Sequence, residues 1–298
     1  MNKQSKPTCP MCHGKQTSLR VSCRDHFTTG EVFDVYECSD CSLIWTLNPP
    51  TPDCMGAYYD TDAYISHSNT KQGIVNKVYH LVRSFMLYKK ALLIEKHTPT
   101  KPGSLLDIGA GIGLFCNYMR KRGWQIEGIE PSVKARSYAQ ECYNLKLKDV
   151  SHLSKLPKES KDIVTLWHVL EHIPNMNEEL SLIHSIIKPG GKLVLALPNP
   201  ASFDASVYKE FWAAYDVPRH LWHFKALALT RLLEKYNFRL IDLKTMPFDG
   251  FYISILSEQH KKNSFAFLKG GWTGLKGWLK SQRRKEKSSS LIYIFEKK

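Results

Sequence analysis

A strand-like run followed by a glycine-rich turn constrains the fold of this chain more than any other segment. Leu105, Leu106, Asp107 and Ile108 precede glycines at positions 109, 111 and 113. Such a short apolar run predicts a strand buried on both faces. Alternate glycines let backbone N–H groups approach a ligand, and a helix that begins near Gly113 directs its positive end toward the same point. The segment therefore predicts a strand, turn and helix that bind a nucleoside.

An acidic residue ends the next predicted strand. Glu130 closes the segment Gln125–Glu130, where nucleotide-binding α/β folds hold the ribose hydroxyls. Two details disfavour a dinucleotide, because Asp107 stands shortly before the first glycine and the glycine spacing is G-x-G-x-G rather than G-x-G-x-x-G. A doubly wound domain that binds NAD or a phosphate at this turn remains the alternative.

The segments further along the chain continue an alternation of strands and helices. A helix is predicted at Leu180–Ile187, and the Lys-Pro-Gly-Gly run that follows it is a helix stop. Strands are predicted at Lys161–Trp167, Lys192–Asn199, Arg239–Thr245 and Leu291–Phe295. This order is typical of an α/β fold with a mostly parallel sheet.

Together these motifs resemble those of the class I S-adenosylmethionine-dependent methyltransferases, over about residues 104–245 and the last strand. The resemblance rests on Asp107 and the glycines, on Glu130, and on a strand that leads to Glu171 and His172. It implies a Rossmann-like α/β fold with a seven-stranded, mostly parallel sheet and an antiparallel last strand. The third strand of this sheet would comprise residues 145–148. It also implies in-line transfer of a methyl group from S-adenosylmethionine.

The resemblance further implies which residues contact the cofactor at the carboxyl ends of the strands. They are Asp107, Gly109, Ala110, Gly111, Gly113, Glu130, Pro131, Asp149, Val150 and Trp167.

Two C-x-x-C knuckles precede this region. Cys9 and Cys12 form the first, and Cys38 and Cys41 form the second. Two knuckles complete a tetrahedral site of four thiolates, which is typical of a structural zinc ribbon. A piece of about forty residues buries too little apolar surface to fold unaided, so the metal would take the place of a core.

Other potential ligands and thiols lie outside the knuckle pattern. We expect neither His13 nor His26 to bind the metal, and we expect the other four cysteines to be buried free thiols; these are Cys23, Cys54, Cys116 and Cys142. Zinc ribbons precede methyltransferase domains in certain ribosomal-RNA and sugar C-methyltransferases, so the ribbon alone does not separate these substrates.

The chain is expected to divide into three parts. Residues 1–55 would form the zinc ribbon, 56–102 a helical lead-in, and 103–298 the methyltransferase domain with an insertion at about 250–288. The lead-in carries apolar residues at helical spacing from Thr70 to His97. That helix would either pack on the core or contact the substrate.

Histidines after the fourth and fifth strands are the candidates for chemistry. His168, Glu171 and His172 would share one face if a helix starts near His168. His220 and His223 lie in the long connection after the fifth strand, and both segments leave the sheet at its ligand-binding edge. His168 or His220 would serve as a general base, whereas the alternative is that these histidines only shape the loops.

The same segment resembles the metal-binding Glu-x-x-Glu-His of small-RNA 2′-O-methyltransferases and ubiquinone-pathway O-methyltransferases. His168 replaces the first glutamate of that pattern. The resemblance implies a second divalent metal at His168, Glu171 and His172. A histidine in that place favours a softer ion than Mg²⁺.

The other residues of this long connection leave their roles open. Arg219 would hold an anionic substrate group or pair with Asp216. Trp212, Tyr215 and Trp222 would form a wall for a flat acceptor or act as packing anchors.

Charge and composition limit the partners. The chain has a net charge of +14, and residues 261–298 hold eleven Lys or Arg against two Glu. The helical pattern of Leu268, Trp272, Leu275 and Leu279 would suit an anionic membrane surface, although docking on the core or a second subunit is equally compatible. Without a transmembrane run or signal peptide, we expect a cytoplasmic protein.

The sequence thus predicts a zinc-ribbon methyltransferase that acts on a small molecule. A ribosomal or transfer RNA substrate is the second hypothesis, and a non-catalytic zinc-containing scaffold is the third.

Overall fold

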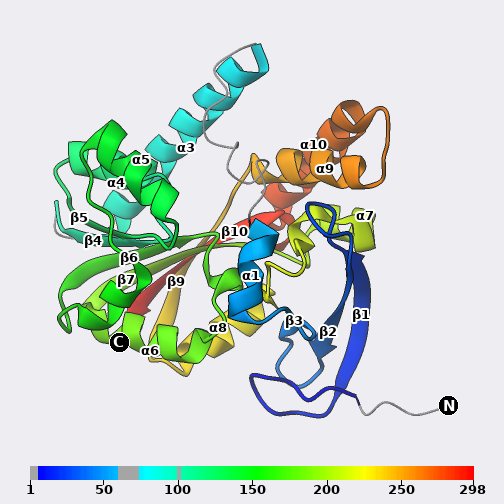
Figure 1. Cartoon of the computed structure of the whole chain (residues 1–298), viewed down its shortest axis with the longest axis horizontal. Helices are drawn as coiled ribbons and strands as arrows, with labels where there is room; N and C mark the ends of the chain where they lie inside the picture. Colours follow the sequence, from blue (N-terminus) through cyan, green and yellow to red (C-terminus); the bar gives the residue numbers. More distant parts are fainter. Residues whose placement is uncertain (1–5, 60–73, 99–101) are drawn as a thin grey trace.

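The computed structural model describes residues 6–59, 74–98 and 102–298 (Figure 1). Within them the main sheet has six strands in the order β5-β4-β6-β7-β10-β9. The strands are β4 (Ser104–Ile108), β5 (Gln125–Ile129), β6 (Lys161–Trp167), β7 (Ile187–Pro198), β9 (Phe238–Thr245) and β10 (Ser290–Lys297). β4 to β7 run parallel, and β10 is antiparallel to both of its neighbours. The predicted Rossmann-like α/β fold with an antiparallel last strand is confirmed.

The strand predicted at 145–148 is reduced to a single bridge between Ile129 and Lys148. Helix α5 (Val133–Tyr143) ends just before it, and the 3-10 helix η1 (Val150–Lys155) begins just after it. Lys148 alone pairs with the β5 edge: its N–H donates to the Gly128 carbonyl and its carbonyl accepts the Glu130 N–H. Leu145 and Leu147 are nonetheless buried, so this segment closes the edge of the sheet without becoming a full seventh strand.

Helices cover both faces of the main sheet (Figure 1). On one face lie α3 (Ile74–His97), α4 (Leu114–Lys121) and α5; on the other lie α6 (Met176–Ile186) and α8 (Ala226–Glu234). β7 shows why: Leu193 and Leu195 pack with α6 and α8, whereas Val194 and Ala196 pack with α3 and α4. The first residues of the predicted lead-in helix, 70–73, lie outside the described residues.

The two cysteine knuckles lie at one end of a second sheet, before its first strand and at the turn from its second strand to its third. β1 (Thr17–Arg24), β2 (Val32–Cys38) and β3 (Ile44–Thr46) form an antiparallel meander, and helix α1 (Pro52–Tyr59) follows them. The fourth strand of this sheet is β8 (Trp222–His223), which pairs with β3. A segment from beyond β7 therefore completes the sheet of the N-terminal region.

The connection from β7 to β8 passes through α7 (Phe203–Tyr208) and the 3-10 turns η3 (Lys209–Phe211) and η4 (Ala213–Tyr215). Trp212 and Tyr215 are almost fully buried against ribbon residues such as Val35 and Ile44. Of the two roles left open for these aromatic side chains, the structure favours packing anchors over a wall for the acceptor.

The predicted insertion is a helical hairpin. α9 (Asp249–His260) packs against α10 (Ala266–Arg283), and the turn η5 (Lys285–Lys287) leads into β10. None of the helices in the described ranges is long and apolar enough to cross a membrane.

Candidate functional site

The glycine-rich turn joins β4 to α4 at the carboxyl edge of the sheet. The backbone N–H groups of Gly109 and Ala110 both donate to the Ile129 carbonyl, at 2.8 and 2.9 Å. Gly111 has a φ of +53°, and a Cβ on it would meet no atom within 4 Å. The turn is therefore tied to β5 on one side and open beside Gly111, as a turn that holds a ligand must be.

Glu130 follows β5 and fixes this turn. Its carboxylate accepts the Gly111 N–H at 2.8 Å and the Ser132 N–H at 2.9 Å. Each oxygen makes one of these bonds, so each keeps a lone pair for a hydroxyl donor. The geometry is the one expected of a residue that binds ribose hydroxyls.

Asp107 lies beneath the turn and is almost fully buried. It accepts a hydrogen bond of 2.5 Å from the Thr165 hydroxyl, and burial raises the pKa of its carboxyl to about 6. Three of the residues predicted to contact the cofactor, Pro131, Asp149 and Val150, are exposed. Asp149 caps η1 by accepting the Ser151 N–H at 2.8 Å.

Sequence reasoning missed a cation beside this turn. The Lys90 ammonium of α3 lies 4.1 Å from the centroid of the Trp167 ring, and burial lowers its pKa to about 8. Within the described residues it has no ion-pair partner, and the indole N–H of Trp167 is buried without a hydrogen-bond acceptor. Lys90 falls within the predicted lead-in helix, but the apolar periodicity that identified the helix does not mark it.

His168 stands at the end of β6 and departs from the predicted geometry. No helix starts there, because only the single 3-10 turn η2 (Leu170–His172) follows and α6 begins at Met176. His168 Nε2 lies 3.2 Å from the Asp249 carboxylate and Nδ1 lies 3.5 Å from Glu171. Despite its partial burial, these two carboxylates raise the pKa of His168 to about 9. A cation does not suit the general-base role predicted for His168.

Glu171 forms a second group with His172 and His220, whose ligand atoms all lie within 4.8 Å of one another. Glu171 is 1% exposed, and neither carboxylate oxygen has a hydrogen-bond partner within the described residues. A buried carboxylate is costly unless a cation compensates it, and the His168 imidazolium, 3.5 Å from one oxygen, supplies part of that compensation. The group predicted at His168, Glu171 and His172 is thus rearranged, with His220 in the place of His168.

Hydrogen bonds fix the tautomers of both histidines. His172 Nδ1 lies 3.0 Å from the Arg219 carbonyl, and His220 Nδ1 lies 3.0 Å from the Ala214 carbonyl. Because a carbonyl only accepts, each Nδ1 carries a proton, and His220 Nε2 lies 3.8 Å from the Asp216 carboxylate. Burial lowers the pKa of His172 to about 4, so that its ring is neutral. Metal-binding histidines are commonly oriented by such carbonyls.

The N-terminal region reaches into this group. The Tyr59 hydroxyl lies 3.0 Å from His172 Nδ1, and the Thr46 hydroxyl donates to the His220 carbonyl at 2.6 Å. Thr46 also lies 3.2 Å from His223 Nε2. Burial lowers the pKa of His223 well below 6.5. His223 lies outside the group formed by Glu171, His172 and His220. None of these three contacts had a signal in the sequence, because the partners are more than a hundred residues apart.

Arg219 pairs with acidic residues rather than facing a substrate. Its guanidinium donates to Asp216 and, at 2.9 Å, to Asp25 of the ribbon, and it is 1% exposed. Of the two roles left open, the structure supports the pairing, which ties the connection before β8 to the N-terminal region.

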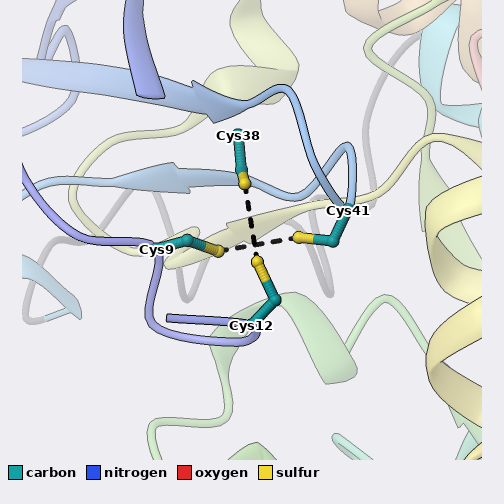
Figure 2. A group of neighbouring side chains, drawn as sticks. All are labelled: Cys9, Cys12, Cys38 and Cys41. Carbon is teal, nitrogen blue, oxygen red and sulfur yellow. Dashed lines mark hydrogen bonds between the residues drawn. The ribbon is translucent and has the colours of Figure 1, made fainter. Parts of the chain in front are cut away.

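The four knuckle cysteines converge as the spacing predicts (Figure 2). Cys9 Sγ lies 3.6 Å from Cys41 Sγ, Cys12 Sγ lies 3.6 Å from Cys38 Sγ, and all four sulfurs lie within 4.8 Å of one another. These distances are too long for disulfides and suit four thiolates around one ion. The prediction that the remaining cysteines are buried is wrong for Cys54 and Cys142, because both thiols lie on outward helix faces.

Fold and site together define an α/β enzyme with a nucleoside-cofactor turn and a cluster of histidines at the same sheet edge. A family model described as a methyltransferase domain matches residues 81–243, more than half of the chain. The chain belongs to this methyltransferase family, and it is an S-adenosylmethionine-dependent enzyme.

Individual relatives agree with the family. A ubiquinone biosynthesis O-methyltransferase of Coxiella burnetii (strain Dugway 5J108-111) is 30% identical over 164 residues, which are 50% of this chain and 69% of that protein. The enzyme of the same name from Xanthomonas euvesicatoria is 31% identical over 130 residues, 41% of this chain and 54% of that protein.

A solved structure shares the fold. The geranyl diphosphate C-methyltransferase of Streptomyces coelicolor A3(2), in complex with Mg²⁺, geranyl diphosphate and S-adenosyl-L-homocysteine, has a TM-score of 0.54 and 11% identity. The match covers 84% of this chain and all of that one.

Proposed function

We propose that the protein methylates a hydroxyl oxygen of a small-molecule acceptor, with a divalent cation bound by Glu171, His172 and His220. Supporting this, the relatives named above are O-methyltransferases of a biosynthetic pathway. The observation that carries the proposal is the group that the buried Glu171 carboxylate forms with His172 and His220, whose ligand atoms all lie within 4.8 Å of one another.

The donor set suits a borderline divalent ion. Two imidazoles and one carboxylate are typical of Mn²⁺, Fe²⁺, Co²⁺ or Zn²⁺ sites that keep open positions. When bound there, such a cation would lower the pKa of the acceptor hydroxyl. Trp222, Phe224 and Leu197 pack beside Glu171 and His220 and make the surroundings of the site apolar.

Residues of the protein itself would align the cofactor with the acceptor. Asp107, the glycine turn and Glu130 would hold S-adenosylmethionine, with Asp149 and Val150 beside its adenine and Trp167 near its methionine end. His168, held as a cation by Asp249 and Glu171, would fix the loop between the cofactor and the acceptor. Methyl transfer by in-line displacement needs mainly such alignment.

We further propose a structural Zn²⁺ at Cys9, Cys12, Cys38 and Cys41, because four convergent thiolates leave no open position for chemistry. The division into 1–55, 56–102 and 103–298 also stays a proposal. A cytoplasmic location is supported by the eight cysteines, none of which forms a disulfide.

Metal titration of the whole zinc-loaded chain tests the acceptor site. Calorimetry with Mn²⁺ or Co²⁺ should show one site that Glu171→Gln and His220→Gln each weaken by tenfold or more. His168→Gln is the comparison variant, since His168 lies outside the proposed ligand set but contacts Glu171 at 3.5 Å, and its metal affinity should fall less than that of the two ligand variants. Loss of affinity in Glu171→Gln and His168→Gln with wild-type affinity in His220→Gln would favour the ligand set predicted from the sequence, whereas binding unchanged in every variant would contradict a metal here.

An RNA acceptor is the competing function, and the basic stretch 261–298 is what favours it. Binding to bulk RNA at increasing salt separates the two. An RNA-modifying enzyme should lose affinity steeply as salt rises, whereas the proposed small-molecule enzyme should show only weak binding. A protein that binds S-adenosylhomocysteine but transfers no methyl group to any phenol, alcohol or RNA would instead fit a scaffold.

A further inference from the structure

Helix α10 uses its small residues, rather than its apolar ones, to pack on the protein. Gly270, Gly274 and Gly277 are buried along one face. A Cβ on Gly270 would lie 2.5 Å from the Cα of Ile255, and one on Gly274 would lie 2.7 Å from the Cα of Phe251. The backbones of α9 and α10 are therefore in direct contact, and the glycines that weaken an isolated helix are what this interface requires.

The large apolar side chains of α10 point the other way. At 3.6 residues per turn, Leu268, Trp272 and Leu279 fall opposite the glycine face, and they are 70%, 59% and 53% exposed. Phe265 and Phe267 at the start of the helix are exposed as well. A surface helix normally turns its apolar stripe to the core. Single exposed apolar residues are ordinary, but a stripe of this length marks a contact surface.

A row of positive charges runs beside this stripe. α10 carries Lys269, Lys276, Lys280 and Arg283, and it contains no acidic residue. The Lys276 ammonium lies 5.1 Å from the Trp272 ring centroid, at the border between the two rows. The surface that complements α10 must therefore be apolar in its centre and anionic around it.

A second copy of this chain fits that description poorly. A symmetric contact through the same face would bring two rows of cations together, which opposes association. An anionic bilayer offers both parts, because the apolar side chains enter the boundary of the acyl chains while lysines reach the phosphates. The hairpin lies at the outside of the molecule, on the same side of the sheet as α3 (Figure 1).

We propose that the outward face of α10, with Phe265 and Phe267 at its start, docks in the plane of an anionic lipid membrane. The adjoining helix α9 begins at Asp249, which pairs with His168 at the candidate site. Docking would thus set the membrane beside the element that borders this site. The inference rests on the hairpin alone and does not depend on the metal or the acceptor.

Vesicle flotation of the full chain tests the proposal. The protein should float with vesicles that contain phosphatidylglycerol and not with pure phosphatidylcholine, and added salt should weaken binding. Lys269→Glu/Lys276→Glu and Leu268→Gln/Trp272→Gln should each reduce binding by about tenfold or more, the first through lost attraction and the second through lost insertion. The fluorescence of the wild type should shift to the blue with the anionic vesicles only.

Matched controls lie on α8, on the opposite face of the sheet. Lys235→Glu and Leu227→Gln change an exposed lysine and an exposed leucine and should leave flotation unchanged. Unaltered S-adenosylhomocysteine binding would show that the α10 variants are folded. Absence of flotation at low salt, or equal flotation of wild type and α10 variants, would overturn the proposal. The proposal would also be overturned if the wild type formed a dimer in sedimentation analysis and did not bind vesicles, while the α10 variants were monomeric.

Discussion

His168 Nε2 lies 3.2 Å from the carboxylate of Asp249, the first residue of α9. This contact joins the end of β6 to the start of the insertion, two segments about eighty residues apart. His168 also adopts a φ of +58°, a conformation that non-glycine residues rarely hold without tertiary support. The ion pair supplies such support.

The His168–Asp249 pair predicts a pH-dependent stability. The folded-state pKa of about 9 lies above the ordinary 6.5, so the pair stabilises the fold fully below pH 6.5 and loses this effect as pH rises through 9. The free energy of unfolding by denaturant should therefore fall between these values in the wild type.

His168→Gln should remove that dependence and cost about 1 kcal/mol below pH 6.5, a value that allows for solvent screening. At pH 9.5 the two proteins should be nearly equal in stability. A difference that grows with pH would show that His168 is neutral in the folded protein.

The position of Lys90 predicts that cofactor binding depends on the charge of its ammonium group. Its ammonium is set beside Trp167 without a partner in the described residues, where it can meet the carboxylate of the cofactor's methionine part. Lys90→Met should weaken S-adenosylhomocysteine binding in calorimetry by about tenfold at pH 7. Because the pKa of Lys90 is about 8, wild-type affinity should also fall as pH rises through that value.

Two comparisons make this prediction specific. 5′-Methylthioadenosine lacks the carboxylate and should bind both proteins alike. Lys89→Met changes the exposed neighbour and should have no effect. An equal loss for both ligands in Lys90→Met would mean that Lys90 supports the pocket rather than the carboxylate.

Two glycines of α10 predict stability changes of opposite sign. Gly274→Ala places a Cβ 2.7 Å from the Phe251 Cα and should destabilise the protein by about 1–3 kcal/mol. Gly271→Ala meets no atom within 4 Å and should stabilise it by about 0.5–1 kcal/mol through helix propensity. Thermal unfolding of both variants measures the two effects. Similar shifts in both would contradict the close contact of α9 and α10.

The cysteine cluster predicts one tightly held zinc per chain. Cys12→Ser should lower the zinc content measured by elemental analysis and reduce the melting temperature by several degrees. Cys54→Ser, which replaces an exposed thiol outside the cluster, should change neither. Full zinc content in Cys12→Ser would require a different set of ligands.

Much of the fold follows from local patterns. The strands around Asp107, Glu130 and Trp167 could be predicted because apolar runs and glycine turns are properties of adjacent residues. The knuckles could be predicted for the same reason, since ligand spacing within each pair reflects a local bend. The strand predicted at 145–148 is wrong in extent, because only Lys148 pairs with β5 and a local apolar pattern does not report how many residues pair.

The candidate site was harder to predict. His220 lies beside Glu171 because the connection that leads into β8 binds the η2 turn, where the Leu221 N–H donates to the Glu171 carbonyl at 2.8 Å. No spacing rule encodes a contact between residues 49 positions apart. The charge of His168 likewise depends on Asp249, which belongs to an insertion. Sequence could identify the histidines as candidates, but their protonation and grouping are properties of the assembled fold.

The pairing of β3 with β8 has a consequence for how the chain folds as it is made. Ile44–Thr46 leaves the ribosome about 175 residues before Trp222–His223, so the ribbon presents an unpaired strand edge throughout that interval. The edge is closed only after the strands from β4 to β7 have been synthesised. The ribbon is therefore synthesised before the strands β4 to β7 and completed only after them.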